Sequence, residues 1–247
     1  MPKTTLKTVL LMTTPDPELI VSMGAKLCYS HADIEQLKET AKSEEFIDRL
    51  TQMGHLSPIE HASFSFGVEG VSRALLAQIT RHRLASFSVQ SQRYVNQSKK
   101  KGEFSYIIPP SIEALGPDAV ARFEKQMETM QKWYEQWVLA LGANGEKSNE
   151  DARFVLPNAC ETKMIITMNA RELLHFFELR CCNRAQWEIR ELAWQMLALV
   201  MEVAPALFKN AGPSCVGGKC AEGRKSCGKM EEIRAKQKKL MEDVTHG

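Results

Sequence analysis

The segment from residue 162 to residue 203 constrains the fold of this chain most, because it joins one strand pattern to two helical patterns. Residues 162–168 (TKMIITM) are rich in β-branched side chains, which is typical of a β-strand. Residues 171–182 and 186–203 then carry apolar side chains at helical spacing. A strand followed by two strong helices predicts a mixed α/β fold.

The rest of the chain continues this mixture. Strands are predicted at 8–13 and 62–68, helices at 18–29, 43–53, 71–83 and 118–141, and loops at 96–110 and 142–149. The sequence shows no internal repeat and no clear domain boundary, and the residues after Gly212 are rich in glycine, lysine and cysteine. We therefore expect a single mixed α/β domain with more helix than strand at residues 1–212, and a peripheral C-terminal tail at 213–247.

Composition and charge narrow the classes of function. The 247-residue chain is 44% hydrophobic and 25% charged, as ordinary soluble globular proteins are. Its net charge of +2 gives no overall field that favours DNA or a membrane, so an anion site must come from local clustering. No apolar run is long enough to cross a bilayer, and the one near the N-terminus is too short for a signal peptide. We expect a cytoplasmic protein.

Seven cysteines, an odd number, indicate reduced thiols rather than a disulfide framework. Three of them, Cys215, Cys220 and Cys227, lie in the tail with four and six residues between them. This spacing is not a CxxC knuckle and no histidine lies close by, so free thiols are favoured and zinc stays an alternative.

Residues 81–94 (RHRLASFSVQSQRY) hold three arginines and one histidine without any acid. The planar guanidinium group of arginine suits phosphate, because it donates two parallel hydrogen bonds. Gln78 and Arg81 share a helical face, and if residues 86–94 are extended, Ser91 and Arg93 point to the same side as Phe87. A face that begins apolar and ends in hydroxyl and guanidinium groups describes the wall of an anion pocket.

Two other interpretations of this segment remain open. Arginines at a helix end can simply be solvated, and the arginines together with Lys99, Lys100 and Lys101 could bind RNA, although few aromatic residues interleave with them. The chain has neither a GxGxxG nor a GxxxxGK[ST] motif. A phosphorylated ligand would therefore be held by side chains rather than by a glycine-rich turn.

The same segment resembles the signature of the flavin-dependent thymidylate synthases, RHRxxSxNxxSxRY. Seven positions match, and Ser88 stands where the pattern has asparagine; the matches are Arg81, His82, Arg83, Ser86, Ser91, Arg93 and Tyr94. Val89 stands where some members carry glutamate. Residues 55–61 (HLSPIEH), 152–157 (ARFVLP) and 169–189 are similar to further family elements, in the same order along the chain.

This resemblance implies both a reaction and an assembly. Members make dTMP from dUMP with 5,10-methylenetetrahydrofolate as carbon donor, FAD as hydride carrier and NADPH as reductant, and they need no enzyme nucleophile. They are homotetramers with sites built from several subunits, on a fold of helices packed around a central, largely antiparallel sheet. Small molecules, and neither a nucleic acid nor a membrane, are then the expected partners.

The family pattern also assigns residues to ligands. The dUMP-binding positions are Gln78, Arg81, Gln90, Ser91, Gln92, Arg93, Arg153 and Arg180. The FAD-binding positions are Ser57, Arg81, His82, Arg83, Asn169, Arg171 and His175. Because several anionic groups would converge there, carboxylates are expected to be absent from the site.

Arg180 is expected to be catalytic, because the resemblance places it at the uracil ring, where a cation stabilises negative charge. It ends the helical apolar stripe of Leu173, Phe176 and Phe177.

Structural alternatives exist for several of these assignments. Arg180 could serve only the helix C-terminus, His175 could pair with Glu178, and Arg153 could pair with Glu150. No resident metal is expected, since His55, Glu60 and His61 lack the HExxH spacing.

Overall fold

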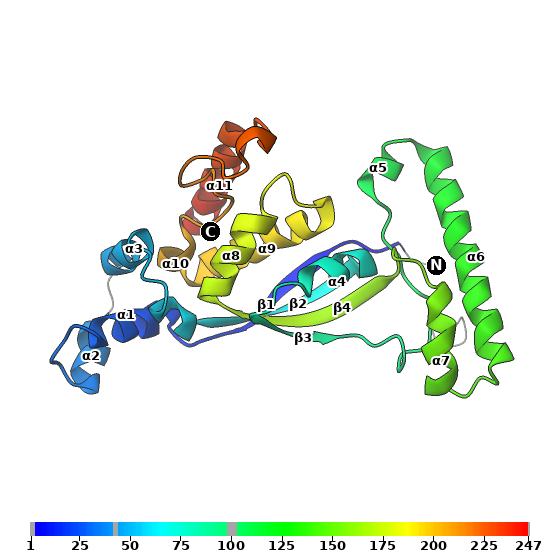
Figure 1. Cartoon of the computed structure of the whole chain (residues 1–247), viewed down its shortest axis with the longest axis horizontal. Coiled ribbons are helices and arrows are strands. Elements are labelled where there is room, and N and C mark those ends of the chain that lie inside the picture. The colour runs from blue at the N-terminus through cyan, green and yellow to red at the C-terminus, as the bar shows by residue number, and fades with distance from the viewer. Residues whose placement is uncertain (1–2, 42–43, 98–102, 247) are drawn as a thin grey trace. The chain divides into compact units, whose positions relative to one another are not determined.

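The computed structural model describes residues 3–41, 44–97 and 103–246, and its central feature is a β-sheet (Figure 1). The strands lie in the order β1-β2-β4-β3. Their bounds are β1 Lys7–Thr13, β2 Ser63–Ser72, β3 Ala85–Val89 and β4 Glu161–Asn169. Ser65 contacts Thr167 at 2.8 Å and Gly70 contacts Glu161 at 3.0 Å, so β2 and β4 run antiparallel. Lys99, Lys100 and Lys101 lie outside the described residues.

Helices make up most of the remaining chain. Their bounds are α1 Pro17–Leu27, α2 Ile34–Thr40, α3 Glu44–Gln52, α4 Arg73–Ile79, α5 Pro110–Glu113, α6 Pro117–Ala140, α7 Glu146–Ala152, α8 Ala170–Arg180, α9 Trp187–Val203, α10 Pro205–Phe208 and α11 Met230–His246. Short 3-10 turns are η1 Pro58–His61, η2 Arg153–Val155 and η3 Gly223–Lys225. The expected mixed α/β class with more helix than strand is confirmed.

The chain divides into two compact units. Unit 1 comprises residues 1–7, 68–81 and 87–165, and unit 2 comprises residues 8–67, 82–86 and 166–247. The candidate site residues fall into both units.

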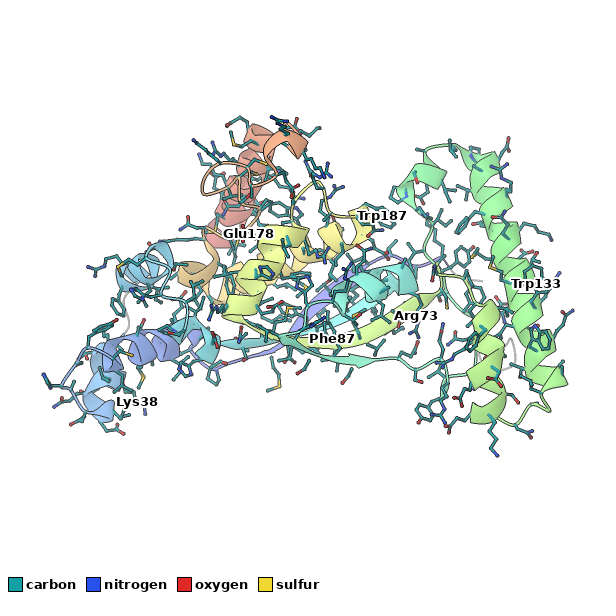
Figure 2. The ribbon with its side chains drawn as sticks, in the orientation of Figure 1. Lys38, Arg73, Phe87, Trp133, Glu178 and Trp187 are labelled. Carbon is teal, nitrogen blue, oxygen red and sulfur yellow. The ribbon has the colours of Figure 1, made fainter. Side chains whose placement is uncertain are left out.

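Unit 1 is built around α6, whose inner face carries the buried Met127 and Tyr134. Met127 packs in a cluster with Phe104 and Tyr106. Trp133 lies on the outer face of the same helix and is about half exposed (Figure 2). At the β2 end of the unit, a Cβ on Gly70 would lie 1.9 Å from the Thr5 carbonyl oxygen, so only glycine fits there.

Unit 2 packs helices α8 to α11 and α1 to α3 around aromatic side chains. Phe177 and Phe208 stack edge-to-face at 6.0 Å, and Phe208 meets Phe64 of β2 at 5.4 Å. The predicted stripe of α8 is confirmed, since Leu173, Phe176 and Phe177 are all fully buried.

Several predicted boundaries were wrong for identifiable reasons. Residues 142–149 are not a loop throughout, because α7 begins at Glu146. Its inward side chains, Ser148 and Asn149, are polar, so the segment has no apolar period to reveal it. The helix predicted at 71–83 is shorter, since α4 ends at Ile79 with Thr80 as its C-cap.

The prediction of a peripheral tail was also wrong. The tail contains α11, which packs against α9 and buries Ile233 and Gln237. Lys236 of α11 lies over the Trp194 ring, 4.4 Å from its centroid. Within the described part of the chain, none of the helices is long and apolar enough to cross a membrane.

Candidate functional site

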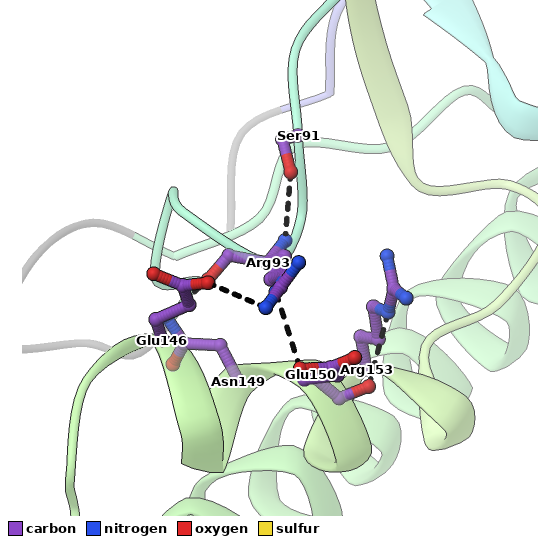
Figure 3. A network of polar contacts seen from close by, with 6 residues as sticks. All are labelled: Ser91, Arg93, Glu146, Asn149, Glu150 and Arg153. Carbon is purple, nitrogen blue, oxygen red and sulfur yellow. Dashed lines mark hydrogen bonds and ion pairs between the residues drawn. The ribbon is translucent and has the colours of Figure 1, made fainter.

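The predicted site residues form two polar groups. One, the Arg93 cluster, lies in unit 1 and consists of Ser91, Arg93, Glu146, Asn149, Glu150 and Arg153 (Figure 3). The other, the His82 cluster, lies in unit 2 and consists of His82, Glu172, His175, Phe176 and Arg180.

A turn after β3 presents Arg93. The Gln90 N–H donates to the Lys163 carbonyl at 2.9 Å, which ends the pairing of the extended segment with β4. The Val95 N–H then donates to the Ser91 carbonyl at 3.0 Å and closes a turn. The condition of an extended chain over residues 86–94 therefore does not hold, because β3 ends at Val89.

Two carboxylates from α7 meet the Arg93 guanidinium. Its Nη2 lies 2.7 Å from Glu146 Oε1, and its Nε lies 3.1 Å from Glu150 Oε2 (Figure 3). The expectation of a site without carboxylates was wrong, since these acids come from a segment distant in sequence. All three side chains are more than 40% exposed, and such exposed ion pairs contribute only about 0–1 kcal/mol. A phosphate can therefore displace them.

The Nε of Arg93 has a further property that bears on ligand binding. Although it lies near Glu150, it is buried as an atom and makes no properly directed hydrogen bond to any described residue. The ion pair with Glu150 therefore leaves this donor without a directed hydrogen bond, which a phosphate oxygen would supply.

Asn149 and Arg153 complete the Arg93 cluster. Asn149 Nδ2 donates to the Arg93 carbonyl at 3.0 Å, which ties the turn to α7. Arg153 Nε donates to the backbone carbonyl of Glu150 at 3.0 Å rather than to its carboxylate, and its terminal nitrogens point away from Glu150 (Figure 3). The alternative pairing of Arg153 with the Glu150 side chain is thus not what the structure shows.

A second guanidinium in unit 1 was missed by the sequence reasoning. Arg73 is the first residue of α4, and its Nη2 donates to the Gln90 carbonyl at 2.8 Å (Figure 2 labels Arg73). Its Nε is buried without a hydrogen-bond partner among the described residues, and burial lowers the pKa of Arg73. The available signal was an arginine at a helix N-terminus, which the helix dipole disfavours.

Two further candidates of unit 1, Gln92 and Gln78, form neutral hydrogen bonds and no ion pairs. Gln92 Nε2 donates to Cys160 Sγ at 3.4 Å, and burial raises the pKa of this thiol to about 11. Gln78 is half-buried in the last turn of α4, and its carbonyl accepts from the exposed Arg81 at 3.3 Å.

In unit 2, His82 stands between an acid and a guanidinium. Its Nδ1 lies 2.9 Å from Glu172 Oε1, and its Nε2 lies 3.1 Å from Arg180 Nε. Arginine only donates, so Nε2 must be the unprotonated acceptor and Nδ1 must carry the proton that Glu172 accepts. His82 is therefore a neutral imidazole that links Glu172 to Arg180.

The environment of His82 keeps it neutral. It is 5% exposed and packs edge-on against Phe176, with ring centroids 5.0 Å apart. Burial lowers the pKa of His82, the hydrogen bond that its Nδ1–H donates to Glu172 raises it, and the charge of Arg180 lowers it again. Because both ring nitrogens already have protein partners, His82 acts on Arg180 rather than directly on a ligand.

Helix α8 carries the remaining candidates of unit 2. Asn169 is its N-cap and accepts from the Glu172 N–H at 2.9 Å, while Arg171 pairs with Glu60 of η1. His175 is exposed, with its ring 6.1 Å from that of His82, and no ion pair joins it to Glu178 in the described part of the chain. Ser57 and Arg83 are exposed. The structure thus groups Asn169, Arg171, His175 and Arg180 on one helix.

Comparison with known proteins identifies the family. Residues 9–206 match the family model described as "Thymidylate synthase complementing protein". The chain belongs to this family. The resemblance drawn from the ordered motifs is confirmed.

Relatives within the family cover nearly the whole chain. A protein from Clostridium tetani named "Flavin-dependent thymidylate synthase" is 50% identical over 243 residues, covering 93% of this chain and 96% of its own. A protein of the same name from Geobacter sulfurreducens is 49% identical over 232 residues, again covering 93% of this chain and 97% of its own.

The fold has a solved counterpart. The crystal structure of the UMP/dUMP methylase PolB from Streptomyces cacaoi bound with 5-Br dUMP matches with a TM-score of 0.69 at 23% identity. The match covers 84% of this chain and 94% of that chain. It confirms the architecture of helices around an antiparallel sheet.

The donors of this family member fit a flavin nucleotide in their chemistry. Arg81 and Arg83 are exposed and form no ion pair within the described residues, so their guanidinium groups can meet a pyrophosphate. The buried Nε of Arg73 is a further donor, without a hydrogen-bond partner among the described residues. These are side-chain donors, as expected for a chain without a glycine-rich phosphate loop.

Proposed function

We propose that this chain is a flavin-dependent thymidylate synthase that methylates dUMP to dTMP. In this reaction 5,10-methylenetetrahydrofolate supplies the carbon, FAD carries the hydride and NADPH is the reductant. The observation that carries the proposal is the sequence identity to relatives of that name. This identity is 49–50% and extends over 93% of the chain. The exposed Arg93 guanidinium of unit 1, held only by weak ion pairs, and the Arg180 of unit 2, held by His82, support the proposal.

The Arg93 cluster is assigned to the dUMP phosphate. Arg93 and Arg153 donate to phosphate oxygens, and the Ser91 hydroxyl, which accepts from the Arg93 N–H at 3.2 Å, adds a short donor. Gln78, Arg81, Gln90 and Gln92 line the same substrate. Substrate binding exchanges the weak pairs with Glu146 and Glu150 for contacts with a doubly charged phosphate.

Arg180 is the catalytic residue of this proposal. Its guanidinium faces the uracil ring and stabilises the negative charge that develops at N3 and O2 when C5 becomes nucleophilic. Neutral His82 holds the Nε of Arg180, and the Glu172 carboxylate fixes the His82 tautomer. His82 and Glu172 are positioning residues, because they act through Arg180.

The thiols of the chain support a route without an enzyme nucleophile. Cys160 lies beside Gln92, but with a pKa of about 11 it remains protonated near neutral pH. Burial also raises the pKa of Cys181 well above its usual value. Bound FAD supplies the hydride chemistry, and Ser57, Arg81, Arg83, Asn169, Arg171 and His175 form its binding region, whereas His82 acts only through Arg180.

The finer properties of the molecule follow by family analogy. We infer a cytoplasmic homotetramer whose partners are dUMP, folate and NADPH, with no nucleic acid or membrane partner. Light scattering after size-exclusion chromatography measures the assembly, and a stable monomer at working concentration would contradict it.

One experiment tests the reaction itself. The protein is incubated with dUMP carrying deuterium at C5, and release of the label is followed with folate, FAD and NADPH each omitted in turn. We expect dTMP only in the complete mixture, and a protein with the visible spectrum of bound flavin. A colourless protein that takes up no added FAD would overturn the proposal.

A further inference from the structure

A polar network in unit 1 holds the chain directly after Arg93, and the proposed reaction leaves its members without a role. We call it the turn network; it consists of Asn96, Gln97, Gln131, Tyr134 and Asn149. Gln131 and Tyr134 lie on the inner face of α6 and are fully buried, and Asn149 of α7 is 1% exposed. Polar side chains this deep in a protein are stable only when they are hydrogen-bonded, so their partners show what they hold in place.

The Tyr134 hydroxyl is the centre of the turn network. It accepts from the Gln97 N–H at 3.2 Å and donates to Asn149 Oδ1 at 3.3 Å. Burial raises the pKa of Tyr134, so the phenol stays protonated near neutral pH and keeps its donor. This one hydroxyl therefore joins the backbone after Arg93 to a side chain of α7.

Asn149 connects Tyr134 to Arg93. Its Nδ2 donates to the Arg93 carbonyl at 3.0 Å, and its Oδ1 accepts from Asn96 Nδ2 at 2.6 Å as well as from Tyr134. An asparagine amide has a donor end and an acceptor end, so these partners allow only one orientation of the group. Tyr134 thus fixes the direction in which Asn149 donates to Arg93.

Gln131 holds the chain at Gln97, the far end of the turn. Its Nε2 donates to the Gln97 carbonyl at 2.7 Å and to Glu135 Oε1 at 3.0 Å, and its Oε1 accepts from the Phe104 N–H at 3.3 Å. Gln131 and Tyr134 are three residues apart and share one face of α6. Gln97 therefore has its carbonyl bound by one of these side chains and its N–H by the other.

Arg93 is in this way held through its backbone as well as through its side chain. Its N–H donates to Ser91 Oγ at 3.2 Å, and its carbonyl accepts from Asn149. Its guanidinium group meets Glu146 and Glu150 in exposed ion pairs, which a phosphate can displace. The backbone contacts to buried side chains stay in place when the ion pairs are lost, and a fully satisfied buried network holds one conformation.

We propose that Tyr134, Gln131 and Asn149 are positioning residues for the phosphate of dUMP, because they hold the turn in the conformation that presents the Arg93 guanidinium. This inference rests on the proposed function, in which Arg93 binds that phosphate. When a binding conformation is populated only in part, the apparent Kd rises by the inverse of its population. Loss of the turn network therefore raises the Kd of dUMP, while substrate that is bound reacts at the normal rate.

The test compares Tyr134→Phe with the wild type, both loaded with FAD. The change removes one oxygen atom and keeps the ring in the core. We expect the Kd and KM of dUMP to rise about 3- to 10-fold, because two hydrogen bonds of the turn network are lost. We expect kcat to change by less than about twofold, since only binding is weakened. A role in packing alone would lower the free energy of unfolding and leave KM unchanged.

Two more variants accompany Tyr134→Phe. Gln131→Met keeps the length of the side chain and removes the contact with the Gln97 carbonyl, so it should also raise the Kd of dUMP. Tyr106→Phe is the matched control, since Tyr106 is buried in unit 1 and its ring lies 6.2 Å from that of Phe123 on α6. It should keep the wild-type Kd, KM and kcat.

A double-mutant cycle shows whether Tyr134 acts through Arg93. Arg93→Lys already removes the planar guanidinium group, whose orientation the turn network sets. Adding Tyr134→Phe to Arg93→Lys should therefore raise the Kd by less than about twofold. Equal factors in the two backgrounds would overturn the inference, because they would show that Tyr134 and Arg93 contribute independently.

The wild-type titration separates this inference from the proposed function. A wild type that binds no dUMP contradicts the proposed function itself. If the wild type binds dUMP and both Tyr134→Phe and Gln131→Met bind it equally well, only the positioning role is overturned. A fall in kcat at unchanged KM also contradicts the positioning role. If Tyr134→Phe does not fold, the Kd of Gln131→Met decides.

Discussion

At the scale of single residues, Arg93 shows how a guanidinium group can form ion pairs in the free protein and still be available to a phosphate. Its guanidinium lies 2.7 Å from Glu146 and 3.1 Å from Glu150, in exposed pairs that contribute little stability. In the proposed role, these ion pairs orient the planar guanidinium group, and a phosphate displaces them readily because they are weak. The proposed role therefore predicts that dUMP affinity falls when the guanidinium group is removed. It predicts no loss of dUMP affinity when a paired glutamate is neutralised.

We expect Arg93→Lys to weaken dUMP binding by about 1–3 kcal/mol, roughly a 5- to 150-fold rise in Kd, because lysine cannot replace the planar fork. Calorimetric titration of the FAD-loaded protein measures it. Glu150→Gln should bind dUMP at least as tightly as the wild type. Arg122→Lys, at an exposed position of α6, is the matched control and should bind normally. Unchanged affinity in Arg93→Lys contradicts the phosphate role.

His82 yields a prediction about pH and stability. Burial and Arg180 lower the pKa of His82, while Glu172 raises it, and the balance is downward. The folded state then binds this proton less readily than the unfolded chain, whose histidine pKa is about 6.5. The contribution of His82 to stability is complete above that pH and is lost as pH falls through the folded-state pKa.

We therefore expect the free energy of unfolding to decrease more steeply from pH 7 toward pH 5 in the wild type than in His82→Gln. The decrease begins near the unfolded-state histidine pKa of about 6.5. Urea unfolding at a series of pH values measures both slopes. His31→Gln changes an exposed histidine and should keep the wild-type slope. Equal slopes for the wild type and His82→Gln would show that His82 is not buried as a neutral group.

At the scale of elements, α8 combines a cap with two proposed ligand roles. Asn169 accepts from the Glu172 N–H with its Oδ1, which leaves the amide nitrogen for the flavin. Asn169→Ala should cost about 1 kcal/mol of stability, because it removes the N-cap. Asn169→Asp keeps the capping oxygen, but it loses the amide donor and places a negative charge beside the flavin. It should unfold at the wild-type temperature yet bind FAD more weakly, as flavin fluorescence titration can check, and normal FAD affinity would leave Asn169 with the cap alone.

Helix α11 contributes to the packing of unit 2, although the glycine, lysine and cysteine content of the tail indicated a peripheral segment. Ile233 is buried in unit 2, where α11 packs against α9. We expect Ile233→Ala to lower the free energy of unfolding by about 2–3 kcal/mol, from lost burial and the cavity left behind. Leu139→Ala removes an exposed leucine of α6 and should change stability by less than about 0.5 kcal/mol. An equally small effect at Ile233 would restore the peripheral interpretation of the tail.

The elements also show what the sequence could and could not predict. The β-branched run of β4 and the apolar stripe of α8 are local signals, and both were predicted correctly. Helix α7 has a polar inner face, with Asn149 buried through hydrogen bonds, so periodicity failed there. That failure hid Glu146 and Glu150, and with them the partners of Arg93. Contacts between distant segments, such as His82 with Glu172, leave no local pattern at all.

At the scale of the whole molecule, the two candidate clusters belong to different units of the chain. Arg93 and Arg153 lie in unit 1, whereas His82 and Arg180 lie in unit 2. A near-neutral net charge of +2 also means that ligand attraction depends on these local groups rather than on a general field. If sites are assembled from several subunits, as the family resemblance implies, a site can take its Arg93 and its Arg180 from different chains.

This arrangement predicts complementation between two inactive variants. Arg93→Ala and Arg180→Ala should each have little activity alone, yet their mixed oligomers should regain about a quarter of the wild-type rate. The reason is statistical: in a random mixture, one site in four takes its Arg93 from an Arg180→Ala chain and its Arg180 from an Arg93→Ala chain. Co-expression with two affinity tags isolates the mixed oligomers. If each site lay within one chain, every site would carry one defect and the mixture would stay as inactive as its parents.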